Sequence, residues 1–578
     1  MTEKKLVIQK LEEMAVLMEL KGENPFKIRA FSNAARIIQG ISQDWDQIIS
    51  TRTLTEIKGI GTGISNFILQ ITNTNEPEDL KTLRKEIPTS LLEMLKIPGM
   101  GAKKVKAVWQ TLHIQSIGEL EYACKENRLL DLEGFGEKSQ QKILQGIELL
   151  KRYSNRHLLS EVVSEAEQIQ ALLREFPEVE TVEISGDLRR WCEVIEYIQI
   201  IVCAADNNHE TIILKLTAEL DPEEVSQQGD AETMIRLKNG IKVILIFANK
   251  QVFPFVLHHT TGSADYIDAL TSHAMSMKLK IDKFGISENE GAQIPCQSET
   301  DIFKNLNIPV IAPEIRENSA VIEAARNHNL PLLLGNRDIQ GVIHTHTTYS
   351  DGLHSLEQLA EAVRSSGYRY LVISDHSKSA IYANGLTEVR LNQQMQEIDR
   401  LNKNWENFRV LKSIECDILS DGQLDYSNEI LSQLDLVIAS IHSRFKMTEA
   451  EATTRIIRAM ENPYTTIIGH PTGRLLLARE GYPLNIKAII DAAAALQIAI
   501  ELNANPHRLD LDWRWLKEAQ DKGVMISINP DAHRIEGIAD MQFGIAMARK
   551  GWLSPENVLN CLNVEEICRF AKSRHTGS

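Results

Sequence analysis

The chain has 578 residues, too many for one hydrophobic core, so we expect three to five domains. Hydrophobic residues make up 43% and charged residues 25%, as is ordinary for a soluble globular protein. The seven scattered cysteines form no C-x-x-C pair and so support neither a disulfide framework nor a zinc ribbon. No signal peptide and no apolar run of membrane length is recognisable, so we expect a cytoplasmic protein without a membrane partner.

The net charge of −16 argues only weakly against nucleic acid, because it is unevenly distributed. Residues 1–155 carry slightly more Lys and Arg than Asp and Glu, so the acidity lies in the rest of the chain. Part of it falls among candidate metal ligands, where bound cations would neutralise it locally. A near-neutral N-terminal region with basic loops permits contact with DNA.

Residues 5–155 are almost wholly helical in pattern, and one element recurs in them three times. It reads EIKGIGTGISNFI (56–68), LKIPGMGAKKVKAV (95–108) and LEGFGEKSQQKIL (132–144). Each copy has two glycines that allow a tight turn and expose backbone N–H groups at a helix start, a geometry that binds phosphate without reading bases.

This element resembles the helix-hairpin-helix motif and predicts non-specific binding to the DNA backbone; the alternative is three hairpins that serve packing alone. The residues expected to contact DNA are Gly59, Gly61, Gly99, Gly101, Lys103, Lys104, Gly134, Gly136 and Lys138.

Three further segments, NPFKIRAFSNAARII (24–38), GDLRRWCEVIEYIQIIV (186–202) and TTGSADYIDALTSHAMSMKLKIDKFGI (260–286), resemble bacterial family X DNA polymerases, and the resemblance runs essentially end to end. It implies a multidomain fold: an α-helical helix-hairpin-helix region, an α+β nucleotidyltransferase palm with a thumb, and a C-terminal α/β polymerase and histidinol phosphatase (PHP) domain, a distorted (β/α)7 barrel. The expected domains are 1–85 and 86–155 (both helix-hairpin-helix), 156–250 (palm), 251–318 (thumb), 319–336 (linker) and 337–575 (PHP).

The palm departs from the family pattern, which is G-S-x-R-R followed by D-x-D on one strand and a third Asp on a later strand. The serine position holds Asp187, and the three carboxylate positions hold Tyr197, Gln199 and Ile244. Without carboxylates nothing neutralises a nucleoside triphosphate, so we expect no polymerase activity. Phe67 stands where members with deoxyribose-phosphate lyase activity carry a lysine, and a phenyl ring cannot form a Schiff base.

The last 235 or so residues place potential metal ligands where apolar runs end. Short β-rich runs alternate with helical stretches, which predicts a parallel barrel-like fold whose strand C-termini converge on one open face. Six histidines with three carboxylates suffice for two or three metal ions, an arrangement suited to phosphodiester hydrolysis. The nine candidates are His344, His346, Asp351, His376, Glu415, His442, His470, Asp531 and His533.

All nine positions also match the PHP pattern residue by residue, and the resemblance implies Glu415 as a carboxylate bridging two ions, with Mn²⁺ or Zn²⁺ as the expected metal. Arg474 and Arg508 are candidate phosphate clamps and, with Glu415, candidate catalytic residues. The alternative for both arginines is an ion pair with Asp510 or Asp512.

Together these features predict a metal-dependent DNA 3′-5′ exonuclease in DNA repair, expected to be a monomer. Two alternatives stay open: a small-molecule phosphatase of the PHP class, which leaves the hairpins unexplained, and a non-catalytic DNA-end binding scaffold, which leaves the nine ligands unexplained.

Overall fold

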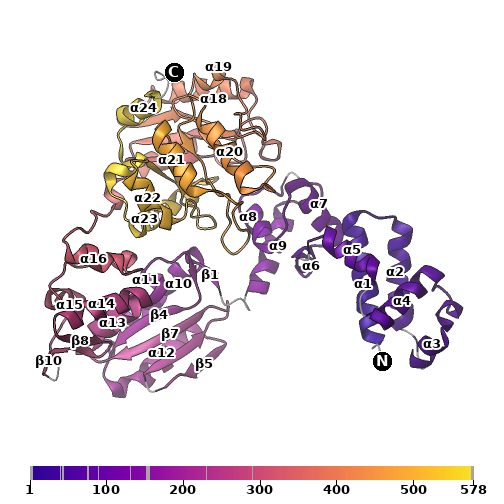
Figure 1. Ribbon diagram of the computed structural model, residues 1–578, viewed down its shortest axis with the longest axis horizontal. Coiled ribbons are helices and arrows are strands. Elements are labelled where there is room, and N and C mark those ends of the chain that lie inside the picture. The colour runs from indigo at the N-terminus through magenta and orange to yellow at the C-terminus, as the bar shows by residue number, and fades with distance from the viewer. Residues whose placement is uncertain are drawn as a thin grey trace. The chain divides into compact units, whose positions relative to one another are not determined.

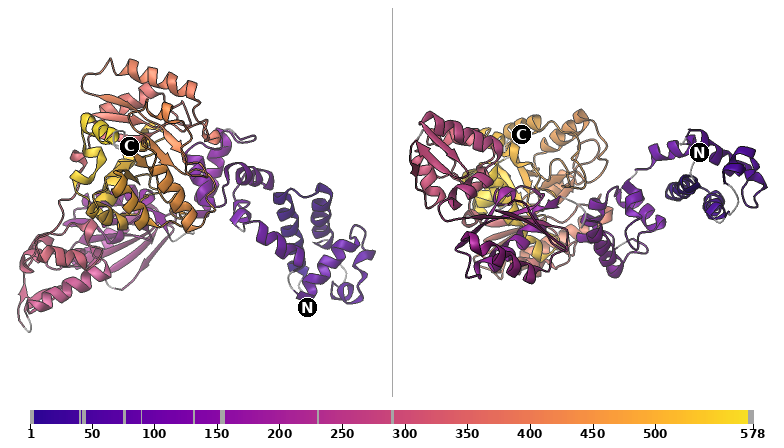
Figure 2. Two further views of the ribbon diagram at one scale, coloured as in Figure 1. Left: turned by 45° about the horizontal axis from the view of Figure 1, so that its top comes forward. Right: turned by 90° about the horizontal axis from the view of Figure 1, so that it is seen from below.

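The computed structural model describes residues 4–39, 41, 45–74, 77–88, 90–130, 132–151, 156–229, 231–288 and 291–573. The chain divides into two compact units, Met1–Leu150 and Lys151–Ser578 (Figures 1 and 2). Among the described helices, none combines the length and apolarity that a membrane span requires.

The first unit is helical throughout its described part, as expected. Its apolar side chains form one continuous core from Val7 to Ile147, so the expected domains 1–85 and 86–155 share a single core. The expected boundary at residue 155 lies outside the described residues. The helices are α1 (Lys4–Lys21), α2 (Pro25–Gln39), α3 (Trp45–Thr51), α4 (Thr62–Thr74), α5 (Glu78–Glu86), α6 (Ser90–Met94), α7 (Ala102–Leu112), α8 (Ile117–Lys125) and α9 (Glu137–Lys151).

The second unit begins with a five-stranded sheet in the expected palm region, in the order β2-β4-β7-β6-β5. Its strands are β2 (Thr181–Ser185), β4 (Ile198–Cys203), β5 (Glu224–Gln227), β6 (Glu232–Arg236) and β7 (Lys242–Ala248). Helices α10 (Leu159–Arg174) and α12 (His209–Leu220) pack on the face that carries Ile198, Ile200 and Val202. Because side chains alternate along a strand, Ile201 lies on the other face, where α13 (Phe253–Thr261) packs.

The expected thumb contains α13, α14 (Ala264–Ser276), β8 (Leu279–Asp282), β9 (Gly285–Glu288), β10 (Gln293–Ile294) and α15 (Glu299–Asn305). Part of the expected linker 319–336 joins it, because α16 (Ala320–Arg326) buries Val321, Ile322 and Ala325 in the same core. The pattern AVIEAAR is amphipathic, so a helix that buries one face is more stable here than a loose connection.

The C-terminal region is α/β with parallel strands, as expected. One sheet has the order β11-β12-β13 and the other β14-β15-β16-β17-β18. Isolated bridges Thr345–Ala532 and His376–Glu415 connect the two sheets. The closed (β/α)7 barrel is not confirmed by these two separate sheets and stays a prediction. The strands are β11 (Gly341–Thr345), β12 (Tyr370–Ile373), β13 (Arg409–Lys412), β14 (Glu415–Asp417), β15 (Ile438–Ser440), β16 (Ile467–Ile468), β17 (Ala499–Asn503) and β18 (Ile526–Asn529).

Helices surround these strands and cover their apolar side chains (Figures 1 and 2). Since parallel strands are covered on both sides, the runs YLVI and AIELN are buried at every position. The main helices are α17 (Leu356–Ser365), α18 (Glu388–Leu401), α20 (Glu449–Met460), α21 (Ile486–Leu496), α22 (Leu516–Asp521), α23 (Met541–Lys550) and α24 (Val564–Lys572).

A buried ion cluster centred on Glu299 joins the palm to the thumb. Its carboxylate accepts from Arg189 at 2.5 Å and from Arg316, whose side chain is only 2% exposed. Burial raises the pKa of Glu299, but His258, Arg316 and Arg189 outweigh it and hold that pKa well below its ordinary value of 4.5.

Replacing Glu299 by Gln should lower the free energy of unfolding by about 3–5 kcal/mol at pH 7, because the buried guanidinium of Arg316 and the half-buried one of Arg189 lose their counter-ion. A carboxylate with a lowered pKa contributes its stability above its unfolded pKa and loses it as the pH falls. The gap between wild type and variant should therefore close below pH 4.5. The thermal unfolding midpoints of wild type and variant, recorded as a function of pH, measure this difference. The control is Asp521→Asn, which breaks an exposed ion pair with Lys517 and should change the midpoint little. An equal effect of both substitutions would contradict the prediction.

Candidate metal centre and DNA-binding elements

The nine candidate ligands lie where the sequence analysis expects them, at the C-terminal ends of the parallel strands. His344 is the fourth of the five residues of β11, His376 follows the end of β12, and Glu415 follows the end of β13 by three residues and begins β14. His442 and His470 follow β15 and β16. Asp531 and His533 follow β18, while His346 and Asp351 follow β11. The C-terminal ends of parallel strands share one edge, so residues far apart in sequence meet here.

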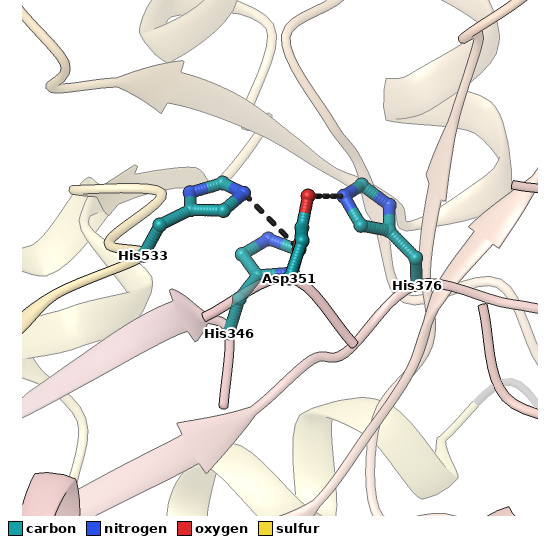
Figure 3. Close-up of side chains that lie close together, drawn as sticks. All are labelled: His346, Asp351, His376 and His533. Carbon is teal, nitrogen blue, oxygen red and sulfur yellow. Dashed lines mark ion pairs between the residues drawn. The ribbon is translucent and has the colours of Figure 1, made fainter. Parts of the chain in front are cut away.

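The structure brings eight of the nine side chains together in three overlapping groups; within each group the potential ligand atoms lie within 4.8 Å of one another. The ninth, His470, is in none of the groups but contacts Glu415. Figure 3 shows the first, in which the carboxylate of Asp351 lies between the rings of His376 and His533. The groups are His346, Asp351, His376 and His533; His344, His346 and Asp531; and His376, Glu415 and His442.

Glu415 links the groups, since its carboxylate is 3.0 Å from the Nε2 atoms of both His442 and His470. The same carboxylate lies 2.9 Å from Nδ1 of His376 and 3.3 Å from Nε2 of His344. A carboxylate in this central place has the geometry expected of a bridging ligand.

Several buried nitrogen and oxygen atoms of the cluster make no hydrogen bond: Nε2 of His344, Nδ1 of His346, both ring nitrogens of His376, Nδ1 of His470, Oδ2 of Asp351 and Oε2 of Glu415. Leaving a buried polar atom without a hydrogen bond costs roughly 1–3 kcal/mol of folding free energy. Seven such atoms in one cluster therefore need a physical explanation. Imidazole nitrogens and carboxylate oxygens are ligands for divalent transition metals, and the residues therefore fit a metal site.

The electrostatics of the cluster also favour bound cations. Burial raises the pKa of Glu415, yet His442, His344 and His376 outweigh it and hold that pKa well below 4.5. Burial lowers the pKa of His376, but Asp351 and Glu415 reverse the effect and raise it to about 10. The carboxylates therefore stay ionised and need positive charge beside them, which protonated histidines or bound cations can supply.

His346 shows the opposite behaviour, because burial and the neighbouring rings of His533 and His376 lower its pKa to about 3. Its imidazole is neutral at pH 7 and keeps a lone pair for a metal.

Sequence analysis missed two carboxylates that hold ligand rings. Oε2 of Glu501, in the middle of β17, is 2.6 Å from Nδ1 of His344, and Oδ1 of Asp417 is 2.5 Å from Nδ1 of His442. Acidic residues inside apolar runs, in AIELN and two positions after Glu415, were the available signal. Ligand histidines commonly bond a carboxylate through the ring nitrogen that faces away from the metal.

The two candidate arginines differ. Arg474 forms the alternative ion pair, with Nη1 2.6 Å from Asp512, and its Nε donates to the backbone oxygen of Arg508. Its guanidinium is thus engaged within the protein, which is the alternative that the sequence left open, and the phosphate-clamp role of Arg474 stays a prediction. Arg508 is 4% exposed and lies against the cluster, with Nε 3.7 Å from Oδ2 of Asp531.

The three glycine-containing turns of the first unit have one geometry. The first glycines, Gly59, Gly99 and Gly134, have φ of 100°, 90° and 86°, which only glycine adopts readily. One residue later, each turn is closed by the same bond to the residue three earlier: Ile60 to Ile57, Met100 to Ile97, Phe135 to Leu132.

The second glycines, Gly61, Gly101 and Gly136, stand directly before helices and are exposed. A Cβ at any of them would meet no atom within 4 Å, so packing inside the unit does not explain these glycines. Of the lysines, Lys103 and Lys138 are exposed, whereas Lys104 donates to Ser139 at 2.7 Å and joins two hairpins.

Two of the three palm positions that lack a carboxylate stand side by side in the sheet. Gln199 on β4 pairs directly with Ile244 on the parallel strand β7, and both point to the face opposite α10 and α12. Tyr197, two residues before Gln199, is 40% exposed. No carboxylate stands at any of the three.

Phe67 is 4% exposed and packs edge-on against Phe31 at 5.0 Å, so it serves the helical core.

Comparison with known proteins supports this organisation. Residues 2–77 match the family described as a helix-hairpin-helix domain, residues 91–148 the SAM-like helix-hairpin-helix tandem, and residues 256–317 the DNA polymerase beta thumb. The DNA polymerase/3′-5′ exonuclease PolX of Bacillus subtilis (strain 168) is 37% identical over 573 residues, which cover 98% of this chain and 99% of that protein.

A second group of relatives matches a smaller part of the chain. A probable phosphatase of Thermoanaerobacter sp. (strain X514) is 27% identical over 232 residues, covering 36% of this chain and 91% of the phosphatase. One of Caldanaerobacter subterraneus subsp. tengcongensis is 27% identical over 248 residues, covering 40% and 90%. The resemblance expected from the sequence is confirmed: the chain belongs to the bacterial family X DNA polymerases that carry a C-terminal PHP domain.

Proposed function

We propose that this protein is a metal-dependent DNA 3′-5′ exonuclease of DNA repair, built on a family X scaffold whose polymerase site is lost. The observation that carries the proposal is the convergence of the nine ligand-type residues around Glu415. The name of the Bacillus relative includes 3′-5′ exonuclease, and its match covers the hairpins as well as the metal centre.

In this proposal the three groups hold two or three divalent ions, Mn²⁺ or Zn²⁺, which would lower the pKa of bound water from 15.7 toward ~7 and so supply hydroxide at neutral pH. The chain's own residues do the rest. Glu415 places the groups relative to one another, and Arg508 provides a buried guanidinium for a phosphate oxygen. Arg474 fixes the backbone of Arg508 through its bond to that carbonyl.

The hairpins supply the hold on DNA. Their second glycines leave room for a backbone phosphate to approach the N–H groups at the start of α4, α7 and α9. This grip is independent of sequence, as an enzyme that removes successive nucleotides requires. Lys103 and Lys138 add positive charge beside two of the turns.

A small-molecule phosphatase remains the second candidate, because the probable phosphatases match about the length of the C-terminal region. Release of mononucleotides from DNA and release of phosphate from histidinol phosphate, measured side by side, separate the two. The monomeric state and the cytoplasmic location remain predictions.

Exchanging Glu415 for Gln should reduce mononucleotide release by more than ~100-fold, beyond the ~10–100-fold typical of losing a residue that only supports a ligand. The amide keeps the volume but loses the charge that four histidines face. Release from DNA labelled at the 3′-terminal nucleotide measures this, with DNA binding as the check that the variant is folded. Undiminished release with unchanged metal content would place the active site elsewhere.

Changing Gly101 to Ala should weaken DNA binding about tenfold, or 1.4 kcal/mol, equally for all sequences. Its backbone (φ −86°, ψ 169°) suits alanine and its surroundings are open, so the fold should be unaffected. Gly99→Ala is the contrasting variant, because φ of 90° makes it strain the turn itself and lower the melting temperature. Titrations of two unrelated duplexes at several salt concentrations give the answer. Unchanged affinity of Gly101→Ala would make the hairpins packing elements only.

Primer extension should be absent with any divalent metal, because Tyr197, Gln199 and Ile244 cannot hold nucleotide-bound metal. The assay belongs in the Glu415→Gln background, where nuclease activity cannot remove the product. Template-directed extension there would refute the loss of polymerase chemistry.

A further inference from the structure

One buried side chain outside the nine candidate ligands contacts several of them. Glu501 lies on β17, the strand that contributes no candidate ligand, and is 0% exposed. Oε2 accepts from Nδ1 of His344 at 2.6 Å and from Asn529 at 2.7 Å. Oε1 accepts from the backbone N–H of His470 at 3.0 Å and from Asn503 at 2.8 Å.

These contacts reach a third ligand, since the side-chain amide of Asn503 also donates to Oδ2 of Asp531 at 3.1 Å. Glu501 is therefore connected to His344 through its ring, to His470 through its backbone, and to Asp531 through Asn503. They lie on three different strand ends, so one carboxylate ties together separate parts of the cluster.

The same three ligands share a second feature. His344, His470 and Asp531 have φ of 66°, 22° and 52°, in a region that residues other than glycine seldom adopt. The other six candidates have no positive φ. Such conformations persist only where the surroundings hold them, and the bonds to Glu501 and Asn503 are that constraint.

We propose that Glu501 is a positioning residue that presets the ligand set by holding His344, His470 and Asp531 in these conformations; the inference rests on the proposed metal-dependent function. With Nδ1–H of His344 bonded to Glu501, Nε2 is left with its lone pair and faces Glu415 and Asp531. The ring is thereby fixed in the tautomer that can bind a metal.

The chemistry requires a carboxylate rather than an amide at this position. All four partners of Glu501 present N–H groups, and an ionised carboxylate is an acceptor only. A glutamine at 501 has one accepting oxygen and one NH₂ group, so whichever way it turns, two N–H groups face another donor. Glu501→Gln keeps the volume of the side chain and removes only this match.

The test is a Co²⁺ titration of the full-length protein after its metals are stripped with a chelator, followed by the visible absorption spectrum. Glu501→Gln should bind Co²⁺ about 10–100-fold more weakly than wild type and give an altered spectrum, as expected when a group that orients metal ligands is lost. Asn503→Leu, which leaves the His344 bond in place, should weaken binding less.

Glu299→Gln is the matched control, since it alters a half-buried glutamate of the same unit that pairs with arginines and not with a candidate ligand. It should lower the melting temperature and leave Co²⁺ affinity and spectrum unchanged. Wild-type affinity and spectrum in a folded Glu501→Gln protein would overturn the inference. Should Glu501→Gln not fold, unchanged Co²⁺ binding by Asn503→Leu would overturn it instead. Failure of the wild-type protein to bind any Co²⁺ would refute the proposed function itself.

Discussion

The C-terminal region depends on one constraint: the buried carboxylates at the strand ends must be balanced by positive charge. Three carboxylates and six histidines lie close together and are largely shielded from solvent, and several of their atoms make no hydrogen bond. Burying charge is costly unless it is paired, so such a cluster is stable only with positive charge among the carboxylates. A protonated histidine can supply part of that charge, and divalent cations can supply more.

The rest of the architecture can be understood as support for this cluster. Parallel strands bring distant segments to one edge, and helices that pack one face on the strands hold them in place. Glu501 orients the ring of His344, and Asp417 orients the ring of His442, each by a hydrogen bond with Nδ1. In the same unit the palm keeps its sheet while Gln199 and Ile244 stand side by side where the family pattern has carboxylates. The fold of that domain therefore does not require those carboxylates, because its stability comes from apolar faces such as that of Ile198 and Ile200.

Much of the candidate site could be predicted from the sequence, since each ligand stands where an apolar run ends and strand ends converge. His344 and Asp531 are examples, found at a meeting point of β11 and β18. Glu501 could not be found in this way, because it lies inside a strand and only its partners show what it does. The partners of Arg474, which are Asp512 and the carbonyl of Arg508, depend on the three-dimensional packing of two loops, and residue spacing in the sequence does not predict them. The α16 helix was missed because a short amphipathic segment gains its stability from the thumb core it packs against.

The most direct test of the account is the anomalous X-ray scattering of crystals grown with Mn²⁺, recorded at the manganese absorption edge. The account predicts two or three anomalous peaks within bonding distance of the side chains around Glu415, including His346 and His376. A nuclease-active protein whose crystals show manganese only elsewhere, or none at all, would contradict it.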